Sequence, residues 1–344
     1  MKKIVFPYDE EFAPVLPFLR NQWKEDEIIL LKPRSWFPYH QNKIVCEEEM
    51  YSIYSELNIK EAVDILFVNS IINIDTKSLV DFIKNINVNC IYIYRMINMI
   101  EREYLKKTFP TSQLIEFGME NNNNEEVLYD IQTPVIGVSG VNEYTGKFNT
   151  QLEIVSNLRK QGYSVGFIGS RNEAYLCEGI SVPNILYDNK YSIKEKVICL
   201  NHCLKKYEIN NKLDVIVLGI PGEIVILNKN YLGNAGEIPF VVSEAVGVSD
   251  LILCMMYDEN LVNQIKIYGD KIAKRFGKNI DQYVIINRML DPDETELRHR
   301  IKYTSIPEIK VKEKMDLKCF KNTYKLFDKQ SLKKLVEDII DILS

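Results

Sequence analysis

The chain has 344 residues, a length typical of two domains, and its 46% apolar content is sufficient for ordinary globular cores. Its net charge of −5, with both signs interspersed, argues against a general binder of nucleic acids or anionic membranes, because such proteins usually carry a basic excess. The apolar runs are far too short to span a bilayer, and the N-terminus lacks the apolar run of an export signal. We therefore expect a cytoplasmic protein whose seven cysteines are reduced.

The first third of the sequence alternates short apolar runs with helical patterns. Strands are predicted at Lys3–Phe6, Ile28–Leu31, Asp64–Val68 and Cys90–Tyr94, helices at Phe12–Trp23 and Asp75–Asn85, and the end of a helix at Asn58–Val63. Continuous apolar strands that alternate with helices indicate a mostly parallel sheet covered on both faces. We therefore expect a Rossmann-like α/β domain over residues 1–118.

A polar segment, MENNNNEE at Met119–Glu126, separates this region from a second alternating series. It has too few apolar residues to contribute to a core, so we place a linker at residues 119–130. The strands predicted after it are Pro134–Val138, Ser164–Ile168, Asp214–Leu218, Leu251–Met256 and Tyr283–Asn287, and the helices are Thr150–Gln161, Ile193–Tyr207, Glu259–Phe276 and Ser331–Leu343. The expected fold class is therefore two α/β domains in series, the second being a P-loop NTPase-like parallel sheet over residues 131–344.

The strongest motif is a loop with a glycine near each end, between a predicted strand and a predicted helix. Glycines allow a tight turn that exposes backbone N–H groups, the helix adds the partial positive charge of its N-terminus, and a lysine adds a full charge. The alternative is an ordinary turn in which the glycines serve backbone geometry alone. We predict a phosphate site, and its residues are Gly140, Val141, Asn142, Thr145, Gly146, Lys147, Phe148 and Asn149.

The loop departs from the common phosphate-loop pattern in two ways. Five residues, rather than four, separate Gly140 from Gly146, as in the loops of dethiobiotin synthetase-like proteins, which this segment resembles. Phe148 stands where a serine or threonine usually offers its hydroxyl to Mg²⁺, so Asn149 and Thr150 are the nearest polar substitutes. The expected ligand is ATP or GTP, with Mg²⁺ as a candidate companion. Acetyl-CoA is the alternative, because binding its phosphates requires no hydroxyl for a metal.

Three polar residues follow predicted strands of the same sheet, where ligands bind in such folds. Glu223 is a candidate catalytic or metal-holding carboxylate, whereas Asp214 begins its strand and is expected at the wrong end for a metal. Arg171 is a candidate contact for a second ligand. Asn287 ends the predicted strand Tyr283–Asn287. In dethiobiotin synthetase-like and cobyrinate synthase-like proteins an asparagine at the end of this strand recognises the nucleotide base, so the resemblance implies that role for Asn287. The alternative for Glu223 is a plain loop acid, and the alternative for Arg171 is a surface ion pair. For Asn287 the alternative is a cap of a turn.

Two other clusters favour structural explanations. Cys199, His202 and Cys203 share one face of a predicted helix, but structural zinc needs about four ligands and no second cluster is visible. We therefore predict core packing and no metal site. The aromatic segment Trp36–His40 is predicted to be a loop that covers the first domain, with a peptide-binding surface as the alternative.

The sequence TGKFNTQLEIVSNLRKQGYSVGFIGSRNEAYLCEG, from Thr145 to Gly179, resembles the phosphate-loop domain of a two-domain family with a Rossmann-like N-terminal domain. That family includes D-glutamate N-acetyltransferase-like proteins, and the layout resembles a branch associated with the maturation of ribosomally made peptide natural products. The resemblance implies a nucleotide-binding accessory protein whose partners are a precursor peptide or a maturation enzyme. The alternatives are a CoA-dependent N-acyltransferase acting on an amino acid or peptide, and a non-catalytic scaffold. We also consider a homo-oligomer, and the sequence leaves open whether the protein is an enzyme.

Overall fold

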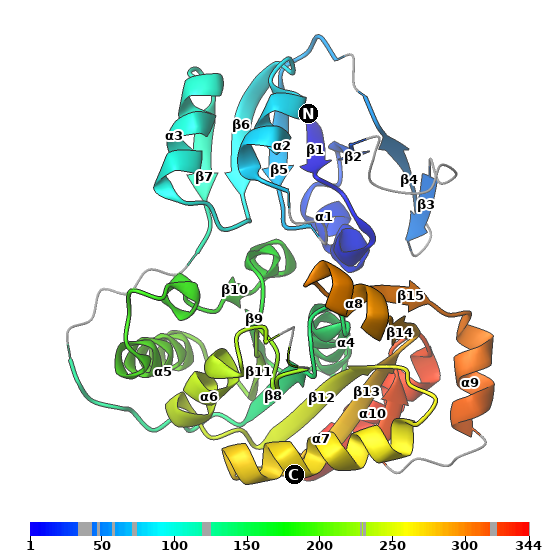
Figure 1. Ribbon diagram of the computed structural model, residues 1–344. Helices are drawn as coiled ribbons and strands as arrows, with labels where there is room; N and C mark the ends of the chain where they lie inside the picture. Colours follow the sequence, from blue (N-terminus) through cyan, green and yellow to red (C-terminus); the bar gives the residue numbers. More distant parts are fainter. Residues whose placement is uncertain are drawn as a thin grey trace. The chain divides into compact units, whose positions relative to one another are not determined.

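The computed structural model describes residues 1–33, 43–46, 49–56, 59–70, 74–118, 125–227, 229, 232–316 and 322–343 (Figure 1). The chain forms two compact units. The first contains Met1–Gly118 together with Asn172–Glu178, and the second contains Met119–Arg171 and Gly179–Ser344. Trp36–His40 and the asparagines at positions 121–124 lie outside the described residues.

A seven-stranded sheet of order β3-β4-β2-β1-β5-β6-β7 forms the first unit. Its strands are β1 (Lys2–Phe6), β2 (Glu27–Leu31), β3 (Lys43–Cys46), β4 (Glu49–Tyr54), β5 (Val63–Phe67), β6 (Val88–Ile93) and β7 (Gln113–Glu116). All neighbouring strands are parallel except β3 and β4, which form an antiparallel pair. Strands β1, β2, β5 and β6 confirm the four strands predicted from apolar runs, and the sheet is mixed rather than wholly parallel.

The helices of the first unit are η1 (Glu10–Val15), α1 (Leu16–Gln22), α2 (Thr76–Ile83), α3 (Met99–Thr108) and the 3-10 helix η3 (Asn172–Cys177). The predicted helix at Phe12–Trp23 is a 3-10 turn followed by an α-helix, with Pro17 in the first turn of α1, where proline is tolerated. The helix end predicted at Asn58–Val63 is wrong: residues 59–62 are not helical, and Val63 begins β5. A single turn forms too few hydrogen bonds to offset the cost of helix nucleation.

The second unit contains a seven-stranded sheet in which every pair of neighbours is parallel (Figure 1). In the order β10-β9-β11-β8-β12-β13-β16, its strands are β10 (Ile180–Ser181), β9 (Val165–Gly169), β11 (Val215–Gly219), β8 (Val135–Gly140), β12 (Asp250–Met256), β13 (Gln282–Ile286) and β16 (Thr323–Lys325). Strands β14 (Arg288–Leu290) and β15 (Tyr303–Ser305) form a separate antiparallel ribbon. The predicted fold class, two α/β sheets in series, is confirmed.

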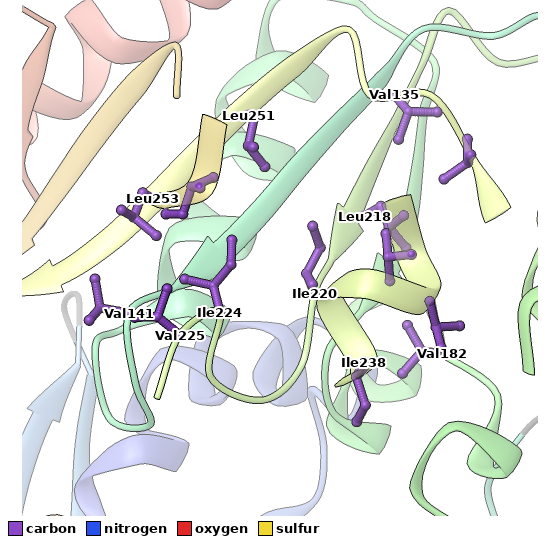
Figure 2. Close-up of a cluster of buried hydrophobic side chains, with 14 of the residues drawn as sticks. Val135, Val141, Val182, Leu218, Ile220, Ile224, Val225, Ile238, Leu251 and Leu253 are labelled. Carbon is purple, nitrogen blue, oxygen red and sulfur yellow. The ribbon is translucent and has the colours of Figure 1, made fainter. Parts of the chain in front are cut away.

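The helices of the second unit are α4 (Lys147–Lys160), η4 (Asn184–Tyr187), α5 (Ile193–Asn210), α6 (Glu237–Ala245), α7 (Leu261–Phe276), α8 (Pro292–Arg298), α9 (Glu308–Asp316) and α10 (Lys329–Leu343). Helix α4 packs on β8, β9 and β11, and α10 packs on α4. A large buried cluster joins apolar side chains of the strands to those of α5, α6 and α7. Figure 2 shows part of it, including Leu218, Ile220, Ile224, Ile238 and Leu251. Both faces of the sheet are thus covered, so polar groups that contact a ligand lie at the ends of the strands.

The face of α5 that carries Cys199, His202 and Cys203 is buried. His202 Nε2 lies 2.6 Å from the carbonyl oxygen of Val127, and its ring packs against Tyr129. Across residues with a described position, no three His, Cys, Asp or Glu side chains gather in a way that could hold a metal ion. None of the helices seen in these parts of the chain is both long enough and apolar enough to cross a membrane.

Candidate functional site

The predicted phosphate loop follows β8, the central strand of the second sheet. Strand β8 lies between β11 and β12, which confirms that the strand predicted at Asp214–Leu218 is a neighbour of the loop. Because all strands are parallel, the carboxyl ends of β8, β9, β11 and β13 share one edge of the sheet. Asp214 is at the opposite edge, where its carboxylate accepts the N–H of Ser164 at 2.7 Å.

Two positions of the loop have room only for glycine. A Cβ added at Gly140 would lie 2.4 Å from Oγ1 of Thr145, closer than real side chains approach. Gly146 has a left-handed φ of 77°, and a Cβ there would lie 2.5 Å from the side chain of Leu326. Gly146 is therefore required by the backbone conformation, whereas Gly140 is required by the side chains of Thr145 and Lys147 that pack against it.

The loop ends at a helix start that has no side-chain cap. Gly146 is the N-cap residue of α4, and it offers no acceptor for the N–H groups of the first helical turn. These groups make no intrahelical bond, so they are available to an acceptor from outside the helix. Asn142 is buried within the same loop, and its Oδ1 has no hydrogen-bond partner among the residues that the structure describes.

Lys147 folds back along the loop. Its Nζ donates a hydrogen bond to the carbonyl oxygen of Gly222 at 2.6 Å, in the turn that follows β11. The stem of the side chain covers Gly140, where an added Cβ would meet Cδ and Cγ of the lysine at 2.8 and 2.9 Å. The ammonium group is thus held between the phosphate loop and the β11 turn.

Two carboxylates lie near this lysine. Glu223 is buried, its Oε2 accepts the N–H of Asn234 at 3.1 Å, and its carboxylate occupies the space where a side chain at Gly233 would lie. Loss of hydration raises the pKa of Glu143, and the negative charge of Glu223 raises it further, whereas Lys147 acts in the opposite direction. The three charged groups therefore interact electrostatically at this edge of the sheet.

Phe148 faces the protein interior instead of offering a metal ligand. The side chain is only 5% exposed, and its ring lies 6.1 Å from the ring of Phe167. The guanidinium of Arg171 lies over the Phe148 ring, 5.3 Å from its centroid. Thr150 does not supply the missing hydroxyl either, because its buried Oγ1 donates to the carbonyl of Gly146 at 3.0 Å.

Buried Gln151 connects α4 to the end of β9. Its Nε2 donates to Oγ of Ser170 at 3.1 Å, and its Oε1 accepts the N–H of Ser170 at 3.2 Å. These two bonds fix the chain immediately before Arg171. The sequence gives no direct sign of this role, because a glutamine within a helical pattern is normally exposed.

The end of β13 contacts the loop through a residue that sequence reasoning missed. The Asn287 side chain donates to the carbonyl of Ile306 at 3.1 Å, so its amide helps to hold the β14–β15 ribbon. The neighbouring Arg288 donates from Nη1 to the carbonyl of Tyr144 at 3.1 Å and lies over the ring of Tyr303, 4.6 Å from its centroid. The ring of Tyr144 lies 5.8 Å from that of Tyr303. These contacts hold Tyr144 at a left-handed φ of 60°.

No established protein-family model matches this chain, and no curated protein does. Among solved structures, the chain is similar to a DUF1611 family protein from Anabaena variabilis, with 12% identity and a TM-score of 0.60. That similarity covers 98% of this chain and 99% of the Anabaena chain, so the two-unit architecture is shared over the full length. A nucleotide-binding protein from Archaeoglobus fulgidus, solved in complex with ADP, is 13% identical over 61% of this chain and 87% of its own, with a TM-score of 0.32.

Proposed function

We propose that the second unit binds a nucleotide and that the loop Gly140–Lys147 holds its phosphates. The observation that carries this proposal is a turn with two glycines that have no room for a side chain, followed by a helix without a side-chain cap. The amine of Lys147 lies next to this turn, where it binds the carbonyl of Gly222. A phosphate here would accept from the first-turn N–H groups and from the lysine, and the helix dipole would stabilise its charge. The lysine would exchange the neutral carbonyl of Gly222 for a charged oxygen, which makes a stronger hydrogen bond.

The base of the nucleotide has a candidate position at the carboxyl end of β13. Tyr303 and Arg288 present a ring and a planar guanidinium next to the loop, and such groups stack on bases. Asn287 has one amide hydrogen bond to Ile306, and its carbonyl oxygen remains a further acceptor for an exocyclic amine. We assign the stacking role to Arg288 and Tyr303, and the base-recognition role to Asn287.

A magnesium ion does not fit the usual position in this loop. Phe148 is buried where the hydroxyl ligand normally stands, and the hydroxyl of Thr150 is bonded to the helix backbone. Glu223 is a buried carboxylate directly after Gly222, whose carbonyl Lys147 binds, and remains the candidate for a metal or a water molecule. We therefore expect nucleotide binding that does not require Mg²⁺.

Phe148, which stands in place of a metal-binding hydroxyl, also favours CoA-dependent N-acyl transfer as a second candidate function. The phosphates of acetyl-CoA need donors but no hydroxyl that binds a metal, and the start of α4 and Lys147 provide donors. Arg171, held over the Phe148 ring, is then the candidate contact for the acceptor's carboxylate. An accessory role in the maturation of a ribosomally made peptide is a more specific proposal than nucleotide binding, and it rests on the sequence resemblance.

Calorimetry of the purified protein with ATP, GTP and acetyl-CoA, each with and without Mg²⁺, separates these functions. Nucleotide binding that is insensitive to Mg²⁺ supports the leading proposal, and selective binding of acetyl-CoA supports acyl transfer. If none of these ligands binds, a non-catalytic scaffold is the better description.

The substitution Lys147→Ala tests the loop within that experiment. We expect it to weaken phosphate binding by about 1.5–3 kcal/mol, because a charge-assisted hydrogen bond is lost. Lys160→Ala is the matched control, because Lys160 is exposed in the last turn of the same helix. Equal affinities for the two variants would contradict the assignment of Lys147.

A further inference from the structure

An apolar pocket of about 220 Å³ lies in the second unit, next to α6 and the end of α7. Its walls include Ile220, Ile224, Val242, Leu251 and Phe276, contributed by the β11 turn, α6, β12 and α7. Figure 2 shows Ile220, Ile224 and Leu251 within the buried cluster on this face of the sheet. The pocket is separate from the phosphate loop, and the proposed function does not use it.

The lining offers little to water or to a charged group. The polar side chains among the lining residues are those of Ser243 and Lys278. The Ser243 hydroxyl donates to the carbonyl of Phe240 at 2.8 Å. The ammonium of Lys278 pairs with Asp281 at 3.0 Å, so its charge is balanced within the protein. A well-ordered water needs two to four polar partners, and the apolar walls of this pocket offer few of them.

The size of the pocket limits what can occupy it. An engineered apolar cavity of about 150 Å³ in another protein binds benzene, so a larger cavity with similar walls accommodates a ring or a short branched chain. An α-helix with its side chains is about 10 Å across, which is too wide for this volume.

We propose that this pocket binds the uncharged apolar end of a small molecule, an aromatic ring or a short branched chain. Burial of apolar surface against aliphatic and aromatic walls supplies the affinity. The balanced charge of Lys278 disfavours a ligand with a net charge at this position. This proposal does not rest on nucleotide binding, and it can be tested with the protein alone.

Occupation of the pocket is coupled to the phosphate loop by a short segment. Ile220 and Ile224, which line the pocket, flank the turn that contains Gly222. The N–H of Ile224 donates to the carbonyl of Gly140 at 3.1 Å, and the carbonyl of Gly222 accepts from Lys147. A ligand that displaces either isoleucine therefore changes the surroundings of Lys147.

Benzene is the probe for the test, followed by the methyl signals of the full-length protein in solution NMR. We expect saturable shifts of the Ile220, Ile224 and Leu251 methyl signals, together with a shift of the Gly222 amide signal. Sodium benzoate, the charged counterpart, should bind more weakly. Absence of methyl shifts at the solubility limit of benzene, or tighter binding of benzoate, would overturn the proposal.

Two filling variants test the location independently. Ser243→Leu in α6 and Gly247→Leu at the pocket lining should each weaken benzene binding about tenfold or more, because the added side chain occupies the space. A Cβ added at Gly247 meets no atom within 4 Å, so this variant should keep its fold. Glu244→Leu, at an exposed neighbouring position of α6, is the control and should leave binding unchanged. Unchanged binding in both filling variants would contradict the assignment.

Discussion

Each edge of the second sheet carries a cluster of one lysine and two carboxyl groups, and the two clusters lie in different settings. The clusters are Lys147, Glu143 and Glu223 at the carboxyl edge, and Lys278, Asp250 and Asp281 at the amino edge. At the amino edge the lysine pairs with Asp281 at 3.0 Å, and Asp250 is fully buried. At the carboxyl edge the lysine donates to the backbone carbonyl of Gly222, and loss of hydration raises the pKa of Glu143.

The two clusters differ in the backbone around them rather than in their charges, and this difference is why we propose binding at the carboxyl edge. At the carboxyl edge a helix begins after Gly146, so N–H groups without intrahelical partners meet the charged side chains. At the amino edge Asp281 accepts the N–H of Leu251 at 2.8 Å, and its other close partner is Lys278. The charges of Asp281 and Lys278 at the amino edge therefore compensate each other within the fold.

The largest expected effect concerns Asp250 at the amino edge. Burial raises its pKa to about 7, the charge of Asp281 adds to this, and Gln282 and Lys278 act in the opposite direction. The folded protein then keeps a proton that the unfolded chain has released, so the free energy of unfolding falls as the pH rises from about 4 to 7. We expect Asp250→Asn to remove up to about 4 kcal/mol of this pH dependence, since each pKa unit corresponds to about 1.4 kcal/mol.

Urea unfolding between pH 4 and pH 8 measures this effect as the stability difference between the variant and the wild type. Asp270→Asn, at an exposed position of α7, controls for the loss of one negative charge. A stability difference for Asp250→Asn that stays constant over this range would show that Asp250 is ionised in the folded protein.

Gly146→Ala should have the next largest effect, this time at the carboxyl edge. The left-handed φ costs about 1 kcal/mol for alanine, and crowding against Leu326 adds about 1–3 kcal/mol. Gly162→Ala is the matched control, because its φ is also left-handed at 93° but no atom lies within 4 Å of the added Cβ. Chemical denaturation should give a loss of about 3 kcal/mol for Gly146→Ala and about 1 kcal/mol for the control. Equal losses would mean that the loop is not closely packed.

Arg288→Met should weaken nucleotide binding while leaving the fold intact. The guanidinium holds the carbonyl of Tyr144 and covers Tyr303, so its loss should cost about 1 kcal/mol, roughly fivefold in Kd. Arg298→Met is the control, since Arg298 pairs with Glu294 on the exposed surface of α8. Calorimetry that gives the same Kd for Arg288→Met and the wild type would remove the β14–β15 ribbon from the binding site.

The smallest expected effect is a pH dependence of phosphate binding that arises from Glu143. Its raised pKa means that this carboxyl group takes up a proton at a higher pH than usual, which reduces repulsion of a phosphate. We therefore expect tighter binding as the pH falls through the range where Glu143 is protonated, by about two- to fivefold, because solvent at the edge of the sheet screens the repulsion between one carboxylate and a phosphate. In Glu143→Gln this part of the pH profile should be absent. If phosphate binding by the wild type and by Glu143→Gln depends on pH in the same way, Glu143 does not interact with the ligand.

Much of the architecture follows from the sequence, because buried parallel strands are continuous apolar runs. Strands β8, β11 and β12 illustrate this, since each was predicted within one or two residues of its ends. Helix α4 begins at Lys147 rather than at the predicted Thr150, because Gly146 starts the helix in a left-handed conformation that no apolar pattern reveals. The β3–β4 pair and the β14–β15 ribbon were not predicted. Strands β4, β14 and β15 lack such runs, and the run in β3, Ile44–Cys46, is only three residues long.

The candidate site was predictable where its residues are contiguous and not where they meet through the fold. The glycines and Lys147 belong to one motif, so the turn could be predicted from sequence alone, and phosphate binding there stays a prediction. Arg288 contacts Tyr144 across 144 positions of the chain, and only the order of the strands brings the two together. The buried hydroxyl of Thr150 likewise depends on how helix α4 begins, which the spacing of residues does not determine.

The central claim is that backbone amides at the start of α4 bind phosphate, and amide NMR signals report on this directly. In a titration of the full-length protein with ADP, the account predicts that the amide signals of Gly146, Lys147 and Phe148 move with a single saturable dissociation constant. If these three signals stay in place while others shift, or if none responds to ADP, the claim is contradicted.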